Sequence, residues 1–390
     1  MKIGLVVEWL DPSRGGAERS TGEFVSQLLS RGVSLEVFTR SGVPSKPGMN
    51  VHTIETTAWT RAGATAQFIR AAENAIGEAG CDLIHALTPC QGAQVYQPRG
   101  GTVAETIRRT LSTRRSAAAR ALKRAGMAFN ARQRLVLAKE RAWLTGDRRP
   151  IVIAISQYVA QQLRHHYSYP DSYIRHILNG VEVTESTPAE RARDRDEIRK
   201  MYGIGDDELL LLAVCHNFRL KGVGCLIEAL SAVVRSGGVT ARALVVGRGH
   251  RRRWGRLARR FGVGDVIGFC GAAERVDAFF HAADVLVHPT YYDPCSRVVL
   301  EAVSRGLPAI STRFDGACEA IEDGVSGFVL PSPEASDALA SRIRILADDG
   351  VRRRMSAAAK RKAGLVSMQR HTEEVCGVYE GLLARAAGSR

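Results

Sequence analysis

The sequence lacks the short motifs of several common enzyme classes. It contains no Walker P-loop, no H-E-x-x-H pair and no G-x-S-x-G elbow, which argues against nucleotide triphosphatases, zinc proteases and α/β-hydrolases. The G-x-G-x-x-G dinucleotide fingerprint is also missing, and no metal-ligand cluster is evident. None of the 8 cysteines has C-x-x-C spacing, which excludes a zinc ribbon and a thioredoxin motif. We expect buried free thiols and no metal site.

Long apolar runs are missing as well. No apolar stretch approaches the ~18 residues needed to span a bilayer. Residues 1–7 lack the longer apolar core of a signal peptide. The sequence therefore predicts a cytoplasmic protein, bound at most to the surface of a membrane.

Acidic residues are scarce in one segment. The 390 residues include 55 Lys+Arg and 40 Asp+Glu, a net charge of +15. Residues 107–149 hold 13 basic and two acidic residues, so they carry +11 of that total and the rest only +4. Such a surplus suits an anionic partner. Three interpretations stay open: a solvated helical face, a surface that docks on anionic lipid, or a nucleic-acid site.

Short apolar runs alternate with helix-length amphipathic segments along the chain. This alternation predicts an α/β protein with parallel sheets covered on both faces. The length suits two to three domains, and the pattern begins afresh near residue 209, so two doubly wound domains with a linker near 180–190 are expected. The expected strands are 3–7, 35–39, 83–87 and 151–155, then 209–215, 243–247, 266–269, 285–288, 309–311 and 327–330.

Ligands of such sheets bind at the carboxyl ends of strands, so the loops there are the candidate sites. Gly15 and Gly16 open a helix after the first strand, where free N–H groups suit an anion, although a tight turn explains them equally well. Arg219 and Lys221 follow the strand 209–214 and can converge on a phosphate pair. Read alone, that pair is more often an exposed basic turn.

A third loop joins the strand 285–288 to a helix that Gly306 ends. Asp293 precedes this helix, Ser296 can cap it, and Glu301 lies inside it. The N–H groups between the two carboxylates can hold a diphosphate. Asp293 as a cap and Glu301 as a solvated residue are equally good explanations. Gly247 ends another strand, and the arginine-rich helix after it is more often a solvated face.

Taken in order, these loops resemble the retaining family 4 glycosyltransferases of the GT-B fold. The resemblance rests on Gly15-Gly16, on Arg219 and Lys221, on residues 246–249, and on Asp293 to Glu301, which has the spacing of the family's E-x7-E motif. It covers nearly the whole chain. The turn 219–222, the segment 137–142 and the basic insertion are similar to the lipopolysaccharide core glucosyltransferases that act on heptose.

The resemblance implies two Rossmann-like domains that face each other across a cleft. It places an acceptor-side domain at 1–182, with the basic insertion at 107–149, and a donor-binding domain at 183–368. A final helix, 369–390, packs back on the first domain in this scheme. The implied reaction moves a sugar from a nucleotide sugar, a UDP-sugar such as UDP-glucose, to a surface glycan or lipopolysaccharide core. It retains the anomeric configuration and needs neither a metal nor a cofactor.

The resemblance also assigns roles. Arg219 and Lys221 would bind the donor diphosphate with N–H groups near Ser296 and Arg297. Glu301 would bind the ribose. The remaining assignments put Gly247 near the base, Asp293 on the donor sugar as the catalytic-site residue, and Gly15 and Gly16 near the phosphate or sugar. Asp293 stands where the family has Glu. Leu87 replaces a family histidine beside His85, so no catalytic base is assigned.

Two further surfaces complete the sequence-based prediction. Arg99 lies in a loop that can face the acceptor and meet an anionic group, although a structural Gly-Gly turn is equally plausible. For the basic segment, docking on the inner face of the cell membrane is preferred over nucleic acid, because apolar and basic residues alternate and no nucleic-acid module is recognised. The expected membrane contacts are Arg108, Arg109, Arg114, Arg115, Arg120, Lys123 and Arg124. The alternatives are a nucleotide-sugar epimerase of the same fold and a non-enzymatic basic binding protein.

Overall fold

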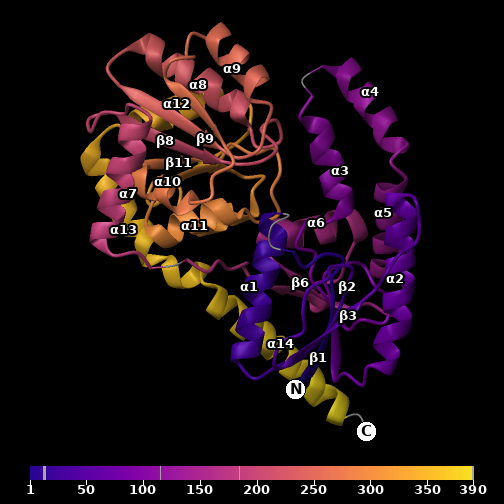
Figure 1. The fold of residues 1–390 in the computed structure, drawn as a ribbon. Coiled ribbons are helices and arrows are strands. Elements are labelled where there is room, and N and C mark those ends of the chain that lie inside the picture. Colours follow the sequence, from indigo (N-terminus) through magenta and orange to yellow (C-terminus); the bar gives the residue numbers. More distant parts are fainter. Residues whose placement is uncertain (12–14, 115, 184, 389–390) are drawn as a thin grey trace. The chain divides into compact units, whose positions relative to one another are not determined.

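The computed structural model describes residues 1–11, 15–114, 116–183 and 185–388. The chain divides into two compact units. Unit 1 comprises Met1–Glu182 and Ser367–Arg390, and unit 2 comprises Val183–Val366. Each unit contains a parallel sheet with helices between its strands (Figure 1), which confirms the predicted α/β architecture of two doubly wound domains.

The sheet of unit 1 is wholly parallel, in the order β3-β2-β1-β4-β5-β6-β7. Its strands are β1 (Lys2–Val6), β2 (Ser34–Thr39), β3 (Met49–Thr53), β4 (Leu83–Ala86), β5 (Val95–Tyr96), β6 (Ile151–Ala154) and β7 (Ile174–His176). Sequence patterns predicted β1, β2, β4 and β6, whose residues are almost all buried. They missed β3, which is a largely exposed edge strand, and β5 and β7, which are too short to show a period.

The helices of unit 1 come from both ends of the chain. They are α1 (Gly16–Ser30), α2 (Arg61–Glu78), α3 (Val103–Ser112), α4 (Ala117–Ala128), α5 (Ala131–Leu144), α6 (Gln157–Tyr167) and α14 (Met368–Gly388), with a 3-10 turn at Asp171–Tyr173. In Figure 1, α14 runs beside α1 along the first sheet. Val375 and Tyr379 of α14 are fully buried in the same core as Leu5 of β1 and Phe24 of α1.

The last helix is tied to unit 1 by main-chain bonds. Val181 and Ser367 form a parallel bridge, and the Met368 N–H donates to the Val181 carbonyl at 3.1 Å. A Cβ on Gly180 would lie 2.5 Å from the Ser367 carbonyl oxygen, so only glycine allows this approach. The two points where the chain passes between the units are therefore bound together on the unit 1 side.

The sheet of unit 2 is also parallel, in the order β10-β9-β8-β11-β12-β13. Its strands are β8 (Leu209–Val214), β9 (Ala241–Val246), β10 (Ile267–Gly271), β11 (Val285–Val287), β12 (Ala309–Thr312) and β13 (Gly327–Leu330). Every one of these strands was predicted from its apolar run. The strands β8, β9 and β12 are almost wholly buried, as expected for strands covered on both faces. The chain order reverses between β8 and β11, and ligands of open α/β sheets bind at such a point.

The helices of unit 2 cover both faces of this sheet. They are α7 (Pro188–Met201), α8 (Val223–Ser236), α9 (Arg251–Arg260), α10 (Val276–Ala282), α11 (Arg297–Arg305), α12 (Ser336–Ile345) and α13 (Asp349–Arg361), with 3-10 turns at Gly316–Ala320 and Ala363–Val366. Among the residues that the structure describes, no helix is long and apolar enough to cross a membrane.

Candidate functional site

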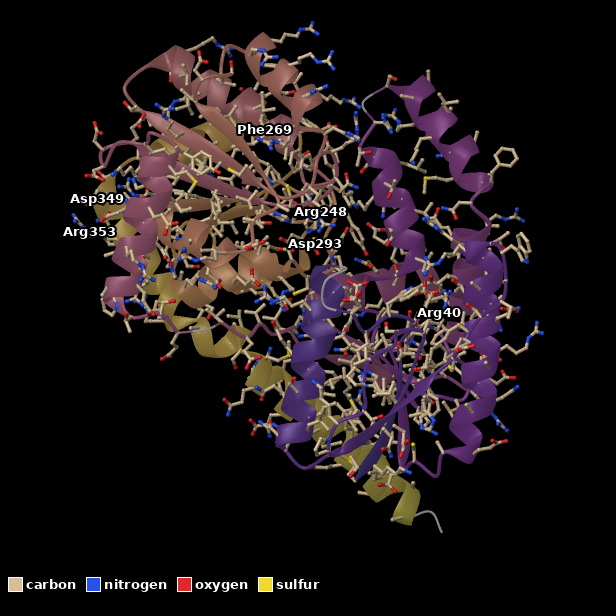
Figure 2. The ribbon with its side chains drawn as sticks, in the orientation of Figure 1. Arg40, Arg248, Phe269, Asp293, Asp349 and Arg353 are labelled. Atoms are coloured by element: carbon tan, nitrogen blue, oxygen red, sulfur yellow. The ribbon has the colours of Figure 1, made fainter. Side chains whose placement is uncertain are left out.

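The loops after β8 and β11 bring two predicted site residues into direct contact. The Lys221 ammonium donates to Asp293 Oδ2 at 2.5 Å and to the Tyr292 carbonyl at 3.2 Å. Both side chains are mostly buried, with 18% and 17% exposed. Asp293 lies at the end of the unit 2 sheet in Figure 2. The sequence-based prediction had Lys221 and Asp293 bind different parts of a nucleotide-sugar donor. In the structure the two side chains form an ion pair with each other.

The two loops are also joined through their backbones. The Leu220 carbonyl accepts hydrogen bonds from the Tyr291 N–H at 2.8 Å and from the Thr290 hydroxyl at 3.1 Å. Gly222 has φ +71°, and a Cβ there would lie 1.9 Å from the Pro289 carbonyl oxygen. Glycine at this position lets the two loops touch, and this contact fixes the position of the Lys221 backbone.

The charge of Asp293 is held by its neighbours. Burial alone would raise the pKa of this carboxyl, but the Lys221 ammonium and His288 outweigh burial and lower the pKa to about 2. His288 Nε2 lies 3.6 Å from Asp293 Oδ2. Asp293 is therefore ionised at neutral pH and acts as an acceptor of hydrogen bonds.

Asp315 supports this loop, and the sequence analysis did not identify it. It is fully buried and accepts from the Ser296 N–H at 3.0 Å, the Ser296 hydroxyl at 2.5 Å, the Ser311 hydroxyl at 2.8 Å and the Ala317 N–H at 2.9 Å. Burial and the nearby Asp293 carboxylate raise the pKa of Asp315. Its position after β12, the next strand in the sheet, is the signal that would have found it.

The start of α11 differs from the prediction in one respect. The Ser296 hydroxyl donates to Asp315 and makes no capping bond to the helix. N–H groups at a helix start suit an anion. Arg297, the first residue of α11, donates to Glu301 Oε1 at 2.9 Å, and both side chains are nearly buried. Gly306 ends α11 in the left-handed conformation, as predicted.

Gly247 and Arg219 flank the same edge of the sheet. Gly247 has φ +131°, and a Cβ would lie 1.9 Å from the Cys215 carbonyl oxygen, so glycine is needed where β9 leaves the sheet beside β8. Arg219 is half-buried in the turn that carries Lys221. Arg248, labelled in Figure 2, is exposed next to Gly247.

The predicted residues of unit 1 lie in two places. Gly15 precedes α1 and Gly16 is its first residue, while residues 12–14 of the same loop lie outside the described chain. Arg99 is 8% exposed, donates to the Ser20 hydroxyl at 2.7 Å and lies over the Phe24 ring at 5.0 Å. The sequence-based prediction had Arg99 face an acceptor. In the structure its guanidinium group is buried against α1 instead.

His85, which occupies a histidine position of the family motif, has a structural role in the core. It is fully buried, and its Nδ1 lies 2.5 Å from the Tyr379 hydroxyl of α14. Burial lowers the pKa of His85 to about 3, with a further contribution from Arg99. His85 is therefore neutral and enclosed, which gives it no access to an acceptor.

Unit 1 contains a cavity that was not predicted from the sequence, although the Gly100–Gly101 loop at its wall was identified as a candidate acceptor loop. Its volume is about 610 Å³, and Gly100, Gly101, Phe129, Arg61 and Arg132 are among its lining residues. Arg132 donates to the buried Glu8 carboxylate at 2.7 Å, directly after β1. Arg61 makes no hydrogen bond or ion pair with a described residue. Two guanidinium groups and an exposed aromatic ring thus border one cavity.

The basic segment forms parts of α3, α4 and α5. No residue of α4 is buried, and Leu122 and the adjoining Phe129 are 77% and 88% exposed. Of the predicted membrane residues, Arg108, Arg120 and Arg124 are exposed, Arg114 and Lys123 are half-buried, and Arg115 lies outside the described chain.

Arg109 contradicts the membrane assignment. Its side chain is 14% exposed and donates to the buried Glu105 at 2.7 Å and to the Tyr158 hydroxyl at 3.1 Å. Glu105 also meets His166 at 2.7 Å, so Arg109 belongs to a network that fastens α3 to α6. Over the described part of the chain, no group of three or more His, Cys, Asp or Glu side chains is placed to hold a metal ion.

Two family models match the chain. The model described as "Glycosyltransferase Family 4" matches residues 14–185, and the model described as "Glycosyl transferases group 1" matches residues 194–362. The first match lies in unit 1 except for its last three residues, and the second lies in unit 2, so the two models follow each other along the chain as the two units do.

Individual proteins agree with these matches. The lipopolysaccharide glucosyltransferase WaaG of Escherichia coli is 25% identical over 334 residues, which is 85% of each chain. A D-inositol 3-phosphate glycosyltransferase of Nocardiopsis dassonvillei is 31% identical over 60% of this chain and 57% of its own.

Solved structures share the fold. The crystal structure of WaaG superposes with a TM-score of 0.79 at 22% identity, over 97% of this chain and 100% of that one. Anabaena HepE in complex with UDP and glucose has a TM-score of 0.69 at 19% identity, over 97% and 99%. Together with the two family models, these relatives establish that the chain belongs to the family 4, group 1 glycosyltransferases of the GT-B fold.

Proposed function

We propose that this glycosyltransferase moves a sugar from a UDP-sugar, such as UDP-glucose, to a surface-glycan acceptor such as a lipopolysaccharide core. The observation that carries the proposal is the Lys221–Asp293 pair at the switch point of the unit 2 sheet, where α11 begins at Arg297. The relatives agree with this donor and acceptor, since one is named a lipopolysaccharide glucosyltransferase and another was solved with UDP and glucose.

The geometry suits a diphosphate leaving group. A donor diphosphate at the α11 N-terminus would take the Lys221 ammonium as a counter-charge, with Arg219 from the same turn. That exchange would leave the ionised Asp293 to accept a hydrogen bond from the donor sugar. Stabilisation of charge on the departing nucleotide is then the main contribution of the protein, and no metal is needed for it.

Glu301 retains an acceptor for the ribose. Arg297 occupies only Oε1, and Oε2 makes no hydrogen bond to a described residue. A carboxylate held in this way keeps its orientation, because Arg297 fixes the first oxygen. Gly247, where β9 ends, is the proposed neighbour of the base.

The cavity of unit 1 is the proposed acceptor site. Arg61 and Arg132 offer charge for a phosphate or carboxylate of the acceptor. The Gly100–Gly101 loop allows close approach of backbone to ligand at its wall. Arg99, which was predicted for this role, instead packs against Ser20 and Phe24 of α1.

The α4 region is the proposed membrane contact. Leu122 and Phe129 are exposed beside Arg120 and Arg124, which is the composition of a helix that lies in a bilayer interface. The protein would work as a peripheral enzyme on the cytoplasmic face of the cell membrane, where a lipid-held acceptor is accessible. Nucleic acid is not expected as a partner.

Donor binding tests the proposal directly. Calorimetry with UDP-, GDP- and ADP-sugars should show binding of a UDP-sugar, and an Arg219→Ala, Lys221→Ala variant should weaken that binding at least about tenfold, since charge-assisted phosphate contacts are worth about 1.5 kcal/mol or more each. The matched control removes two exposed arginines of α13, Arg353→Ala and Arg354→Ala. Undiminished sugar transfer by the Arg219, Lys221 variant would refute the donor site.

An assay without acceptor separates the proposal from the epimerase alternative. An epimerase would interconvert free nucleotide sugars, whereas a transferase with donor alone would at most hydrolyse them slowly. Membership in a glycosyltransferase family already argues against the non-enzymatic alternative.

Vesicle binding tests the membrane contact. A Leu122→Ser, Phe129→Ser variant should bind phosphatidylglycerol vesicles at least about tenfold more weakly, because it loses inserted apolar area. The control is Met201→Ser, Leu365→Ser, which removes two exposed apolar side chains of unit 2. Equal binding by the two variants would remove α4 from the membrane contact.

A further inference from the structure

The helix α9 of unit 2 carries a concentration of positive charge that donor binding does not use. From Gly247 to Val263 the chain contains seven arginines and no Asp or Glu. Arg251, Arg252, Arg253, Arg256, Arg259 and Arg260 are all exposed on α9, and Arg248 precedes them. The stick view shows nitrogen-tipped side chains pointing away from the domain along this helix (Figure 2).

The inner face of α9 is fixed to the core of unit 2. Trp254, Leu257 and Phe261 pack against the buried cluster, and Ala258 is fully buried within it. Trp254 meets the Phe218 ring edge-on at a centroid distance of 6.2 Å. Because these apolar residues are turned inward, the outer face of α9 offers charge without apolar side chains or stacking surfaces.

The charge pattern opposes the stability of the helix itself. Arg251, Arg252 and Arg253 occupy the first turn, where the helix dipole disfavours cations, and that turn has no acidic residue. Arg256 follows Arg252 by four residues and Arg253 by three, which adds like-charge repulsion. The Arg256 Nε donates only to a backbone carbonyl of its own helix, and Arg252, Arg253 and Arg260 have no side-chain partner among the described residues. A solvated face gains nothing from this arrangement, whereas an anionic partner would offset the repulsion.

We propose that the outer face of α9 is a second membrane contact, which binds the anionic phospholipid headgroups of a bilayer by charge alone. The guanidinium group suits phosphodiesters because it donates in a planar fork. The inference rests on the proposed function, in which the enzyme works at a membrane through α4 of unit 1. It adds a contact in unit 2 of a different kind, one that is more sensitive to salt because nothing inserts.

The test compares two variants of the full chain that lose the same number of charges. The α9 variant carries Arg252→Gln, Arg253→Gln, Arg256→Gln and Arg260→Gln. The control carries Arg193→Gln, Arg353→Gln, Arg354→Gln and Arg361→Gln, all exposed residues of α7 and α13. Both are mixed with vesicles of 30% phosphatidylglycerol in phosphatidylcholine, with pure phosphatidylcholine vesicles as the uncharged reference.

We expect the α9 variant to bind the anionic vesicles about a hundredfold more weakly at low salt and the control to change less than about threefold. The α9 variant should also melt at the same or a higher temperature than the wild type, because it loses the repulsion within the helix. A triple change of α4, Arg120→Gln, Lys123→Gln and Arg124→Gln, should leave residual vesicle binding that the α9 changes then abolish.

Equal losses by the α9 variant and the control would overturn the proposal, because net charge would then explain them. Unchanged vesicle binding with lost binding to duplex DNA would also overturn it and assign α9 to nucleic acid. UDP-sugar binding is measured on the same proteins and should match the wild type. If the wild type bound no nucleotide sugar, the proposed function would fail while the vesicle result for α9 would still stand.

Discussion

Lys221 owes its position to a contact between backbones one residue away. Gly222 has φ +71°, and the space where its Cβ would be is filled by the Pro289 carbonyl oxygen, 1.9 Å away. The loop from β8 therefore lies against the loop from β11. Lys221 and Asp293 meet at 2.5 Å because these two loops touch.

Replacing Gly222 by Ala should affect both stability and donor binding. The left-handed conformation costs an alanine about 1 kcal/mol, and the clash with Pro289 forces the loops apart at a further cost of roughly 1–3 kcal/mol. We expect urea unfolding to show this loss and calorimetry to show weaker UDP-sugar binding, because Lys221 moves away from the proposed diphosphate site at the start of α11.

Gly203 provides the matched control for this prediction. It has φ +60° in the same unit, but nothing lies within 4 Å of its Cβ position. Gly203→Ala should lose only about 1 kcal/mol and keep its donor affinity. If the two alanine variants behaved alike, backbone strain alone would explain the effect and the contact between loops would have no role.

The helix α14 is held in unit 1 by two buried histidines and their partners. His85 meets the Tyr379 hydroxyl at 2.5 Å, and His371 meets the Gln97 amide at 3.1 Å and the Leu178 carbonyl at 2.9 Å. Burial lowers the pKa of His371 well below its usual value, and the Arg99 and Arg370 guanidinium groups act in the same direction. Both rings are therefore neutral in the folded protein.

This arrangement makes the stability of unit 1 depend on pH. Each histidine takes up a proton in the unfolded chain below about pH 6.5, whereas burial lowers the pKa of His85 to about 3 and that of His371 well below its usual value in the folded chain. The contribution of each ring to stability is therefore complete above pH 6.5 and is lost as the pH falls. We expect the urea midpoint to fall from pH 7 to pH 5. Tryptophan fluorescence suits this measurement, since Trp9, Trp59 and Trp143 lie in unit 1.

His371→Gln should flatten that dependence even though it lowers the midpoint at pH 7. The variant removes one proton that the unfolded chain binds, which reduces the slope by up to about 1.4 kcal/mol per pH unit. A slope equal to that of the wild type would show that His371 is not the group responsible.

Sequence patterns predicted the strands and helices better than the hydrogen-bond partners of their side chains. Every strand of unit 2 and the helix α11 follow from apolar runs, from Gly306 and from strand-end logic. The same logic named Lys221, Asp293 and Glu301. It could not show that the Ser296 hydroxyl donates to Asp315 instead of capping α11, because that choice depends on a carboxylate 19 residues away.

Buried arginines were the least predictable part of the site. Arg99 and Arg109 both stand in basic or glycine-rich sequence that suggests a surface. One packs on Phe24 and the other pairs with the buried Glu105. A charge run gives no sign of which of its members has an internal partner, because the partner comes from another element. The short strands β5 and β7 were missed for a related reason, since their pairing depends on neighbours in the sheet.

The two units differ in how far each can fold alone, because unit 2 is one segment of the chain and unit 1 is built from two. Unit 2 is one continuous segment with its own sheet and core. The core of unit 1 is closed by the last helix, so Val375 and Tyr379 cover residues that were made first. The helix α14 is therefore needed to complete the hydrophobic core of unit 1.

Fragments of the chain test this dependence. Residues 183–366 expressed alone should unfold cooperatively in urea, because every strand and helix of their core is present. Residues 1–182 alone should bind a hydrophobic dye and lack a sharp transition, because the apolar face that α14 covers would be exposed to water. Adding residues 367–390 through a short glycine-serine linker after residue 182 should restore the transition, since Val181 and Ser367 are paired neighbours. A cooperative transition of 1–182 at the midpoint of unit 1 in the full chain would show that α14 adds nothing to that core.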